Sequence, residues 1–238
     1  MAMNRVLMRL ADDEQRRLRP HLESVRLARG TSLCAVNTVA RHAYFPVTGL
    51  VSIVALTREG NNLEVAAIGR EGIVGLPHML HAAPAPYAST VQLNGEAYRL
   101  RADLFVSEFG RAAGLHDGVL HALRELVVQI SQSAVCHRFH SVTQRLARSL
   151  LTSRDGTDAD TLELTQEVLA LRLGAARTGI SVAAARLQDR GLIRIRHGRI
   201  RILNRPALER ASCECYHIVK SQIGHGQSRS ASGRLTRR

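Results

Sequence analysis

The sequence predicts an α+β fold with an N-terminal antiparallel β roll, one long helix, and a C-terminal helix-turn-helix followed by a two-stranded wing. Three observations support this prediction. Short β-type runs broken by glycines fill residues 25–100, a heptad-like apolar stripe occupies residues 120–137, and residues 164–203 combine two helical patterns with an alternating hairpin. We divide the chain into four segments: 1–114, 115–138, 139–220, and a basic tail at 221–238 that we expect to be disordered.

The first segment opens with a helical pattern and then changes to β-type runs. Residues 6–22 predict a short amphipathic helix that ends near Pro20. Glycine corners between the later runs are typical of an antiparallel sandwich or roll, and residues 50–56 and 63–68 form the clearest hairpin. The runs are VRLA, AYFPV, LVSIVAL, LEVAAI, STVQL and EAYRL.

The second segment carries apolar residues at alternating intervals of three and four, which is the a/d pattern of a coiled-coil seam. This stripe is narrower than that of a helix packed into a monomer core. It therefore favours a helix that pairs with its twin in a homodimer, with plain core packing as the alternative. The expected interface residues are Leu120, Leu123, Val127, Ile130 and Ala134.

The third segment contains two helices separated by a tight turn. A preceding helix is expected at 142–152, with a polar loop at 153–158. Thr165 can cap the next helix, Gly174 ends it, and another begins at Arg177 with small apolar residues that let two helices cross closely.

The hairpin that follows reads as a wing. Residues 193–202 alternate Ile with Arg on either side of a His197-Gly198 pair. Strict alternation places the Ile side chains on one face and the Arg side chains on the other. A two-residue turn closing such strands predicts a β-hairpin.

The charges are distributed unevenly along the chain. The formal net charge is +13, and 32 of the 33 cations are Arg. Up to His137 there are 14 basic and 12 acidic residues, whereas the remainder has 19 basic and 8 acidic ones. This distribution is expected when one domain senses or assembles and the other holds a polyanion. Double-stranded DNA is the leading partner, against the alternative of Arg residues that only decorate a solvated face.

Composition excludes several other classes. With 238 residues, 45% of them hydrophobic, the chain can bury a core without stabilising disulfides or metal ions. Its four cysteines lack the spacing of a disulfide framework, which fits a reducing compartment. No apolar run approaches the ~18–20 residues of a membrane helix and no signal-peptide core is found, so we expect a cytoplasmic protein without a membrane partner. No catalytic motif is recognisable, so we expect no catalytic residues and no enzyme activity.

An α-helix fits the major groove with its first residues at the base edges, which assigns roles to the residues of the third segment. Arg177 is the best candidate for a bidentate contact to guanine, and Thr178 and Ser181 can reach neighbouring bases. Contacts to phosphate are expected from Thr165, Gln166, Arg194, Arg196 and Arg199.

The order of roll, long helix and winged helix-turn-helix resembles the Crp/Fnr family of bacterial transcription regulators from about Leu22 to Tyr216. The resemblance is carried by YFPVTGLVSIV, EVAAIGREGIVGLP, LTQEVLALRLGAARTGISVAAARLQDRGLIR and ASCECY. It implies an effector domain of the cyclic-nucleotide-binding type at 1–114, a dimerisation helix at 115–138 and a DNA-binding domain at 139–220. The homodimer would bind a pseudo-palindromic operator, with RNA polymerase as a further candidate partner.

The chain departs from this family where members bind cyclic AMP. The glycine corner is present at Gly72 and Gly75, but the family's ribose-binding Glu falls on Leu76, and its phosphate-binding Arg-Ser pair falls near Tyr87 and Ala88. Because residues 72–90 contain no Arg or Lys, a cyclic phosphate would be buried without a charge partner. We therefore expect these five positions to line a pocket for an unidentified effector, and we expect no cyclic nucleotide or other cofactor.

Two further departures concern the recognition helix and iron. Thr178 and Val182 replace a Glu and a second Arg of the cyclic-AMP-responsive members, so the operator should differ from theirs. Cys34 stands alone near the N-terminus, which does not support the iron–sulfur cluster of the oxygen-sensing branch.

Two alternatives to a ligand-responsive regulator stay open. One is a regulator that acts without a ligand, as a repressor or activator. The other is a metal or redox sensor built from Cys and His residues, whose spacing lacks the usual zinc-finger pattern. Its candidate residues are Cys136, His137, His140, Cys213, Cys215 and His217. We interpret Cys136 as a small buried hydrophobe and expect no metal site.

Overall fold

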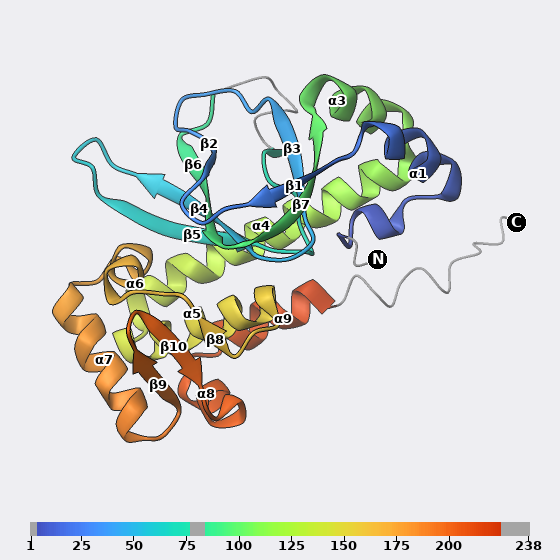
Figure 1. Cartoon of the computed structure of the whole chain (residues 1–238). Coiled ribbons are helices and arrows are strands. Elements are labelled where there is room, and N and C mark those ends of the chain that lie inside the picture. The colour runs from blue at the N-terminus through green and yellow to red at the C-terminus, as the bar shows by residue number, and fades with distance from the viewer. Residues whose placement is uncertain (1–3, 77–83, 225–238) are drawn as a thin grey trace, which may run out of the picture.

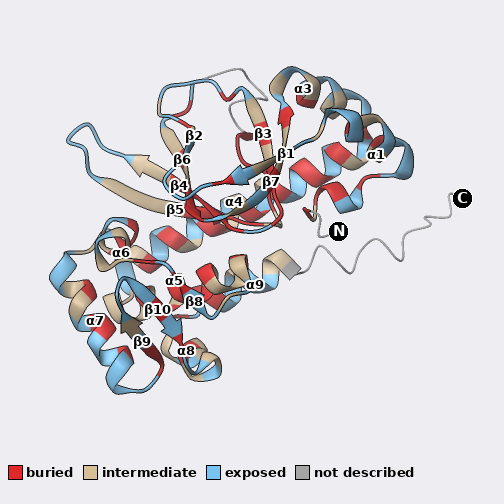
Figure 2. Ribbon diagram, in the orientation of Figure 1, coloured by how far each residue is buried: buried red, intermediate tan, exposed pale blue. Residues whose placement is uncertain are grey.

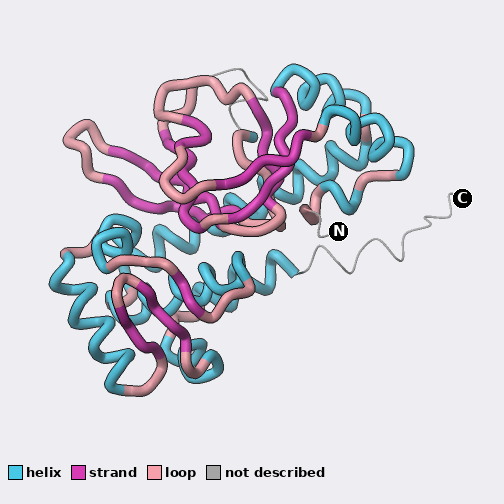
Figure 3. The backbone as a smooth tube through the Cα atoms, in the orientation of Figure 1, coloured by secondary structure: helices cyan, strands magenta, loops and turns pink. Residues whose placement is uncertain are grey.

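The structure is a computed structural model that describes residues 4–76 and 84–224. A β domain and a smaller helical domain with its own small sheet are joined by one long helix, α4 (Ala113–Phe139), which runs under the β domain (Figures 1 and 3). This is the predicted α+β architecture. The stretch 77–86, whose three prolines predict a loop, falls largely on residues outside the described ranges.

The N-terminal domain is an antiparallel roll of two sheets. One sheet has the order β1-β7-β3 and the other β2-β6-β4-β5. β4 and β5 form the predicted hairpin, with Val51 opposite Ile68 and Leu56 opposite Asn62. The strands are β1 (Glu23–Leu27), β2 (Ser32–Cys34), β3 (His42–Pro46), β4 (Leu50–Leu56), β5 (Asn62–Ile68), β6 (Tyr87–Leu93) and β7 (Gly95–Arg101).

The N-terminal amphipathic segment is not the single helix that the pattern predicts. It consists of short 3-10 turns at Leu7–Arg9 and Arg19–His21 on either side of α1 (Asp12–Leu18). The break follows from Glu14, whose carboxylate accepts from the backbone N–H of Ala11 at 3.0 Å and of Gly114 at 2.9 Å. The buried carboxylate of Glu14 thus caps the N-terminus of α1, so that a new helix begins there, and links this helix to the beginning of α4.

The helix α4 follows α3 (Ala102–Arg111) and has two unlike sides (Figure 2). The side against the roll begins with apolar residues such as Leu115 and continues with buried polar residues, Glu125, Gln129 and Ser133. Gln129 accepts from the backbone N–H of Ala67 at 3.1 Å, which satisfies a donor on the edge strand β5. The opposite side exposes large apolar residues.

The C-terminal domain surrounds a core of Leu, Ile and Ala side chains that also includes Leu50, Ala67 and Leu93 of the roll. The two domains therefore share one hydrophobic cluster. Its elements are α5 (Val142–Thr157), β8 (Thr161–Leu162), α6 (Gln166–Leu173), α7 (Arg177–Asp189), β9 (Ile193–Arg196), β10 (Arg199–Ile202), α8 (Arg205–Ala211) and α9 (Cys215–Gly224).

Two boundaries differ from those expected. The polar stretch 153–157 continues α5 as helix because Ser153 is fully buried and Asp158 supplies a left-handed C-cap with φ 55°. Residues 221–224, assigned to the tail, are the last turn of α9, which lies against α4 and α5. The rest of the expected tail, 225–238, is outside the described residues.

In the described ranges, no single helix is long and apolar enough to cross a membrane. The helices α6 and α7 meet the same length and composition criteria only when taken together, and the chain bends by 111° between them.

Candidate nucleic-acid interface

The helices α6 and α7 form a helix-turn-helix because local signals start and stop each of them. The Thr165 hydroxyl accepts from the backbone N–H of Val168 at 3.3 Å and caps α6. Gly174 ends α6 in the left-handed region, with φ 52°. The resulting bend of 111° lies in the range of helix-turn-helix motifs.

One face of α7 packs into the domain and its N-terminus is free. Ile180, Ala184 and Leu187 are buried, whereas Arg177 and Thr178 are exposed in the first turn. Within the described residues, Arg177 makes no ion pair. The first turn of α7 therefore presents a free guanidinium and a hydroxyl at the place where base edges would be read.

Ser181 and Gln166, two other predicted contact residues, are in contact with each other. The Ser181 hydroxyl lies 2.7 Å from Gln166 Oε1 and 3.0 Å from the Arg177 carbonyl oxygen. This contact ties the start of α6 to the first turn of α7. Ser181 thus has a structural role in fixing the angle between the two helices, whatever it contacts on DNA.

The wing is built as its alternation predicts. His197 and Gly198 both have positive φ, 46° and 73°, which is the requirement of a type I′ turn. β10 pairs with β9 and with β8, so that the hairpin is the outer part of a three-stranded sheet. Its Ile side chains face the core, and the Arg side chains are exposed.

The exposed face of the wing concentrates positive charge. Arg194 lies opposite Arg201, and Arg196 lies opposite Arg199. Like charges directly opposite each other in a sheet are destabilising, and an anion placed across them relieves the repulsion. In the described residues, the ion pair on this face joins Arg199 to Glu163 at 3.1 Å, with both side chains more than half exposed.

The predicted dimer stripe lies on the exposed side of α4. Val127 is 62% exposed, Leu120 50% and Ile130 40%, and Ala134 is also exposed. Leu123 is half-buried and packs against the apolar cluster of the roll. Four of the five predicted residues thus form an apolar surface that no other part of the described chain covers.

In the described residues, which leave out 77–83, the five predicted effector residues do not line one cavity together: Gly75, Tyr87 and Ala88 lie outside the cavity that Gly72 and Leu76 share. Gly72 and Leu76 line a cavity of about 10 Å³ against α4, and Leu76 fills the core beside it. Tyr87 and Ala88 lie on β6, where burial raises the pKa of Tyr87 to about 12 and keeps the phenol neutral. A cavity of this size holds no more than one water molecule.

Sequence reasoning missed a buried ion pair between the two domains. Arg172 of α6 donates to both carboxylate oxygens of Glu64 on β5 at 2.9 Å, and their side chains are only 7% and 14% exposed. Arg172 also donates to the Ser153 hydroxyl at 3.4 Å, and the Ser52 hydroxyl donates to Glu64. Since 108 residues separate the partners, no local pattern could have shown the pair.

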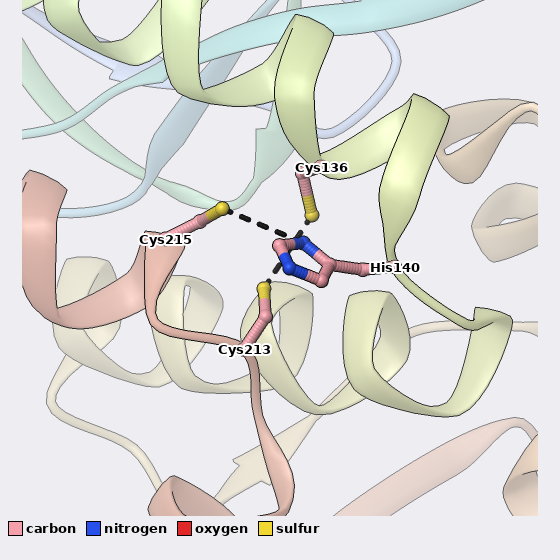
Figure 4. A group of neighbouring side chains, drawn as sticks. All are labelled: Cys136, His140, Cys213 and Cys215. Carbon is pink, nitrogen blue, oxygen red and sulfur yellow. Dashed lines mark hydrogen bonds between the residues drawn. The ribbon is translucent and has the colours of Figure 1, made fainter.

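The structure brings four of the six Cys and His candidates together. Cys136, His140, Cys213 and Cys215 meet at the end of α4 (Figure 4). His137 points elsewhere and lies 3.0 Å from the Arg145 guanidinium, and burial together with this cation lowers its pKa. His217 is exposed. Cys136 is buried, as expected, but its buried neighbours are Cys213 and Cys215 rather than apolar residues.

Comparison with known proteins supports the same two domains. The family model of the cyclic nucleotide-binding domain matches residues 24–111, and that of the Crp-like helix-turn-helix domain matches residues 144–211. A search of curated proteins gives no match.

Solved structures show the same fold at low sequence identity. A Crp/Fnr-family transcriptional regulator from Eubacterium rectale is 16% identical, with a TM-score of 0.68 over 87% of this chain and 97% of that one. FixK2 from Bradyrhizobium japonicum is 15% identical, with a TM-score of 0.68 over 81% and 98%. The c-di-GMP-responsive global regulator CLP from Xanthomonas campestris is 18% identical, with a TM-score of 0.64 over 82% and 100%.

A nucleotide-binding-like roll in tandem with a helix-turn-helix whose recognition surface is exposed defines a DNA-binding transcription regulator. More particularly, the chain belongs to the Crp/Fnr family, because the cyclic nucleotide-binding and Crp-like helix-turn-helix models together match more than half of the chain. The resemblance in the sequence is confirmed.

Proposed function

We propose that the protein is a homodimeric, cytoplasmic transcription regulator that binds a pseudo-palindromic operator and has no enzymatic activity. The observation that carries the proposal is the surface formed by the Arg face of the wing and by Arg177 at the start of α7, which has no ion-pair partner in the described ranges. Arg177 would make a bidentate contact to guanine in the major groove, with Thr178 beside it. Arg194, Arg196 and Arg199 would neutralise phosphates and fix the register.

The exposed apolar stripe of α4 supports the homodimer. A coiled-coil pairing of two α4 helices buries Leu120, Val127 and Ile130, which the single chain leaves in water. Two recognition helices would then face DNA half-sites about one helical turn, or ~34 Å, apart. RNA polymerase is the further partner that activation would require.

The roll is proposed as the sensory domain, with an effector other than a cyclic nucleotide. Residues 72–90 supply no cation for a cyclic phosphate, and the cavity beside Leu76 has a volume of about 10 Å³. A regulator that acts without a ligand remains the competing proposal. The two differ in whether a small molecule that binds the roll changes the affinity of the protein for its operator.

Selection of bound duplexes from a random DNA library, with the full chain at physiological salt and without ligand, tests this function. We expect enrichment of a two-fold site with half-sites about ten base pairs apart. Recovery of unselected DNA with a steep salt dependence would contradict specific binding by the free protein.

Two Arg variants test the division of roles on the enriched site. We expect Arg177→Ala to cost about 1–3 kcal/mol and to relax one base position, whereas Arg196→Ala should weaken binding to all sequences and reduce the salt slope by about one unit. Equal behaviour of both variants across sequences would show that α7 is not the reading helix.

A further inference from the structure

Four potential metal ligands converge from two segments that are distant in the sequence. Cys136 and His140 lie one helical turn apart, at the end of α4 and just after it, and Cys213 and Cys215 flank the start of α9 (Figure 4). Their sulfur and nitrogen atoms all lie within 4.8 Å of one another. We propose that these four side chains form a structural zinc site of the Cys₃His type. This inference goes beyond the proposed function and does not depend on DNA binding.

The spacing of the donor atoms matches a tetrahedral zinc ion. Zn–S bonds of about 2.3 Å and Zn–N bonds of about 2.0–2.1 Å at tetrahedral angles place two sulfurs ~3.8 Å apart and a sulfur and a nitrogen ~3.6 Å apart. Cys136 Sγ lies 3.5 Å from Cys213 Sγ, and Cys215 Sγ lies 3.6 Å from His140 Nδ1. The other pairs of donor atoms lie within 4.8 Å of one another, so shifts of up to about 1 Å would accommodate the ion.

The site is closed, as structural zinc sites are. Cys136, Cys213 and Cys215 are 2%, 1% and 0% exposed. They form a buried cluster of their own, separate from the three hydrophobic clusters of the described residues. Their burial therefore does not serve the apolar core. Four protein donors leave no open coordination position, so the ion would hold the fold rather than activate water.

The surroundings orient and balance the ligands. Glu214 Oε1 lies 3.2 Å from His140 Nε2, so that the carboxylate can hold the proton on Nε2 and leave the Nδ1 lone pair directed at the cluster. Such a carboxylate behind a histidine is the usual second partner of metal-binding imidazoles. The Arg148 guanidinium lines the same cavity as Cys136 and brings a positive charge to the ligand cluster. Metal binds the thiolate form of cysteine, which a nearby cation favours.

A redox disulfide is the competing explanation for the paired sulfurs. A disulfide would use only Cys136 and Cys213. It would not explain why His140 and Cys215 lie beside them, or why Glu214 contacts the far side of the imidazole. The set of four donors favours zinc. The ion would fasten the end of α4 to the segment between α8 and α9, and so join the helix that carries the dimer stripe to the DNA-binding domain.

Metal analysis of the full chain tests the proposal directly. The protein is purified without an affinity tag, under reducing conditions, and zinc is measured by mass spectrometry. We expect about one zinc per chain, and its loss in Cys213→Ser and Cys215→Ser. The matched controls are Cys34→Ser, at a buried cysteine in β2, and His217→Ala, beside the site but outside it; both should keep the metal.

Cobalt provides a readout that does not depend on whether the cysteine variants fold. The wild-type protein loaded with Co²⁺ should show the intense visible bands of a tetrahedral site and a thiolate-to-metal charge-transfer band. Glu214→Gln should keep these bands and weaken zinc binding about 10–100-fold. The proposal is overturned if the reduced wild type contains no zinc and binds neither Zn²⁺ nor Co²⁺, or if its Cys136 and Cys213 are recovered as a disulfide.

Discussion

The buried Glu64–Arg172 pair should make a larger contribution to stability than any other ion pair between the two domains in the described residues. Glu64→Gln leaves the Arg172 guanidinium buried, with only the weaker acceptor groups of its neighbours. Breaking a buried pair from one side costs about 3–5 kcal/mol. Because the Ser153 hydroxyl and the Gln92 amide also face the guanidinium, we expect a loss of about 3 kcal/mol, at the lower end of that range.

Replacing both partners should have a very different effect. Glu64→Leu combined with Arg172→Met removes both charges and fills a similar volume, and such exchanges are commonly neutral or stabilising. The double variant should therefore be within about 1 kcal/mol of the wild type. The interdomain pair of the half-buried Arg70 and the exposed Asp158 provides the control, since Arg70→Ala should cost less than about 1 kcal/mol.

Urea unfolding followed by circular dichroism measures these differences, because the chain has no Trp and only four Tyr for fluorescence. All variants are compared at one protein concentration, since a dimer would make stability depend on concentration. A loss below about 1 kcal/mol in Glu64→Gln, or a double variant as unstable as the single one, would refute the reasoning.

The remaining predictions concern the dimer stripe, a buried carboxyl group and a turn. Val127→Glu should abolish the dimer in sedimentation velocity, whereas Val106→Glu, at an exposed position on α3, should not; an unchanged profile for Val127→Glu would contradict the stripe. Burial, and then the charge of a neighbouring glutamate, raises the pKa of Glu125 from 4.5 to about 7, so the folded state loses stability as the pH rises through this range. Glu125→Gln should therefore stabilise the folded state by about 1–2 kcal/mol at pH 8 and have little effect near pH 4. The expected gain is below the ~3 kcal/mol that corresponds to the full pKa shift, because solvent screens the charge. Equal effects at both pH values would rule out the ionisation of Glu125 as the cause. Gly49→Ala should lower the free energy of unfolding by more than about 3 kcal/mol in thermal unfolding, because its Cβ would lie 2.7 Å from a carbonyl oxygen. The control Gly60→Ala has a similar φ but open space around it, and should cost only about 1–2 kcal/mol. Similar losses would show that backbone movement relieves the crowding at Gly49.

Elements with strong local signals could be predicted from the sequence. The β4–β5 hairpin, the wing and the capped helices α6 and α7 have alternation, turn residues or caps that act within a few residues. The three-residue strand β2 has no such signal, because its pairing with β6 depends on a partner far along the chain. The division of the first helix likewise depends on Glu14 reaching Gly114.

The candidate site could be predicted where the residues lie close together in sequence. Arg177 and the Arg face of the wing follow from helix and strand periodicity alone. The Cys and His cluster could only be suspected, because 77 residues separate Cys136 from Cys213, and spacing rules for zinc describe ligands that lie nearer to each other. Only the return of α9 to the side of α4 shows that His140 belongs to the group and His137 does not.

The polar inner side of α4 has a consequence for how the two halves of a dimer would be aligned. Apolar packing tolerates sliding, whereas the hydrogen bond from the Ala67 N–H to Gln129 has a fixed direction, and its loss leaves two buried polar groups unpaired at a cost of about 1–3 kcal/mol each. The roll therefore fixes the rotation of α4 about its own axis, and with it the direction in which Val127 would face a second copy. We expect a displacement of β5 to turn this stripe about the helix axis. The backbone amide of Ala67 would then determine how two copies are oriented in a dimer.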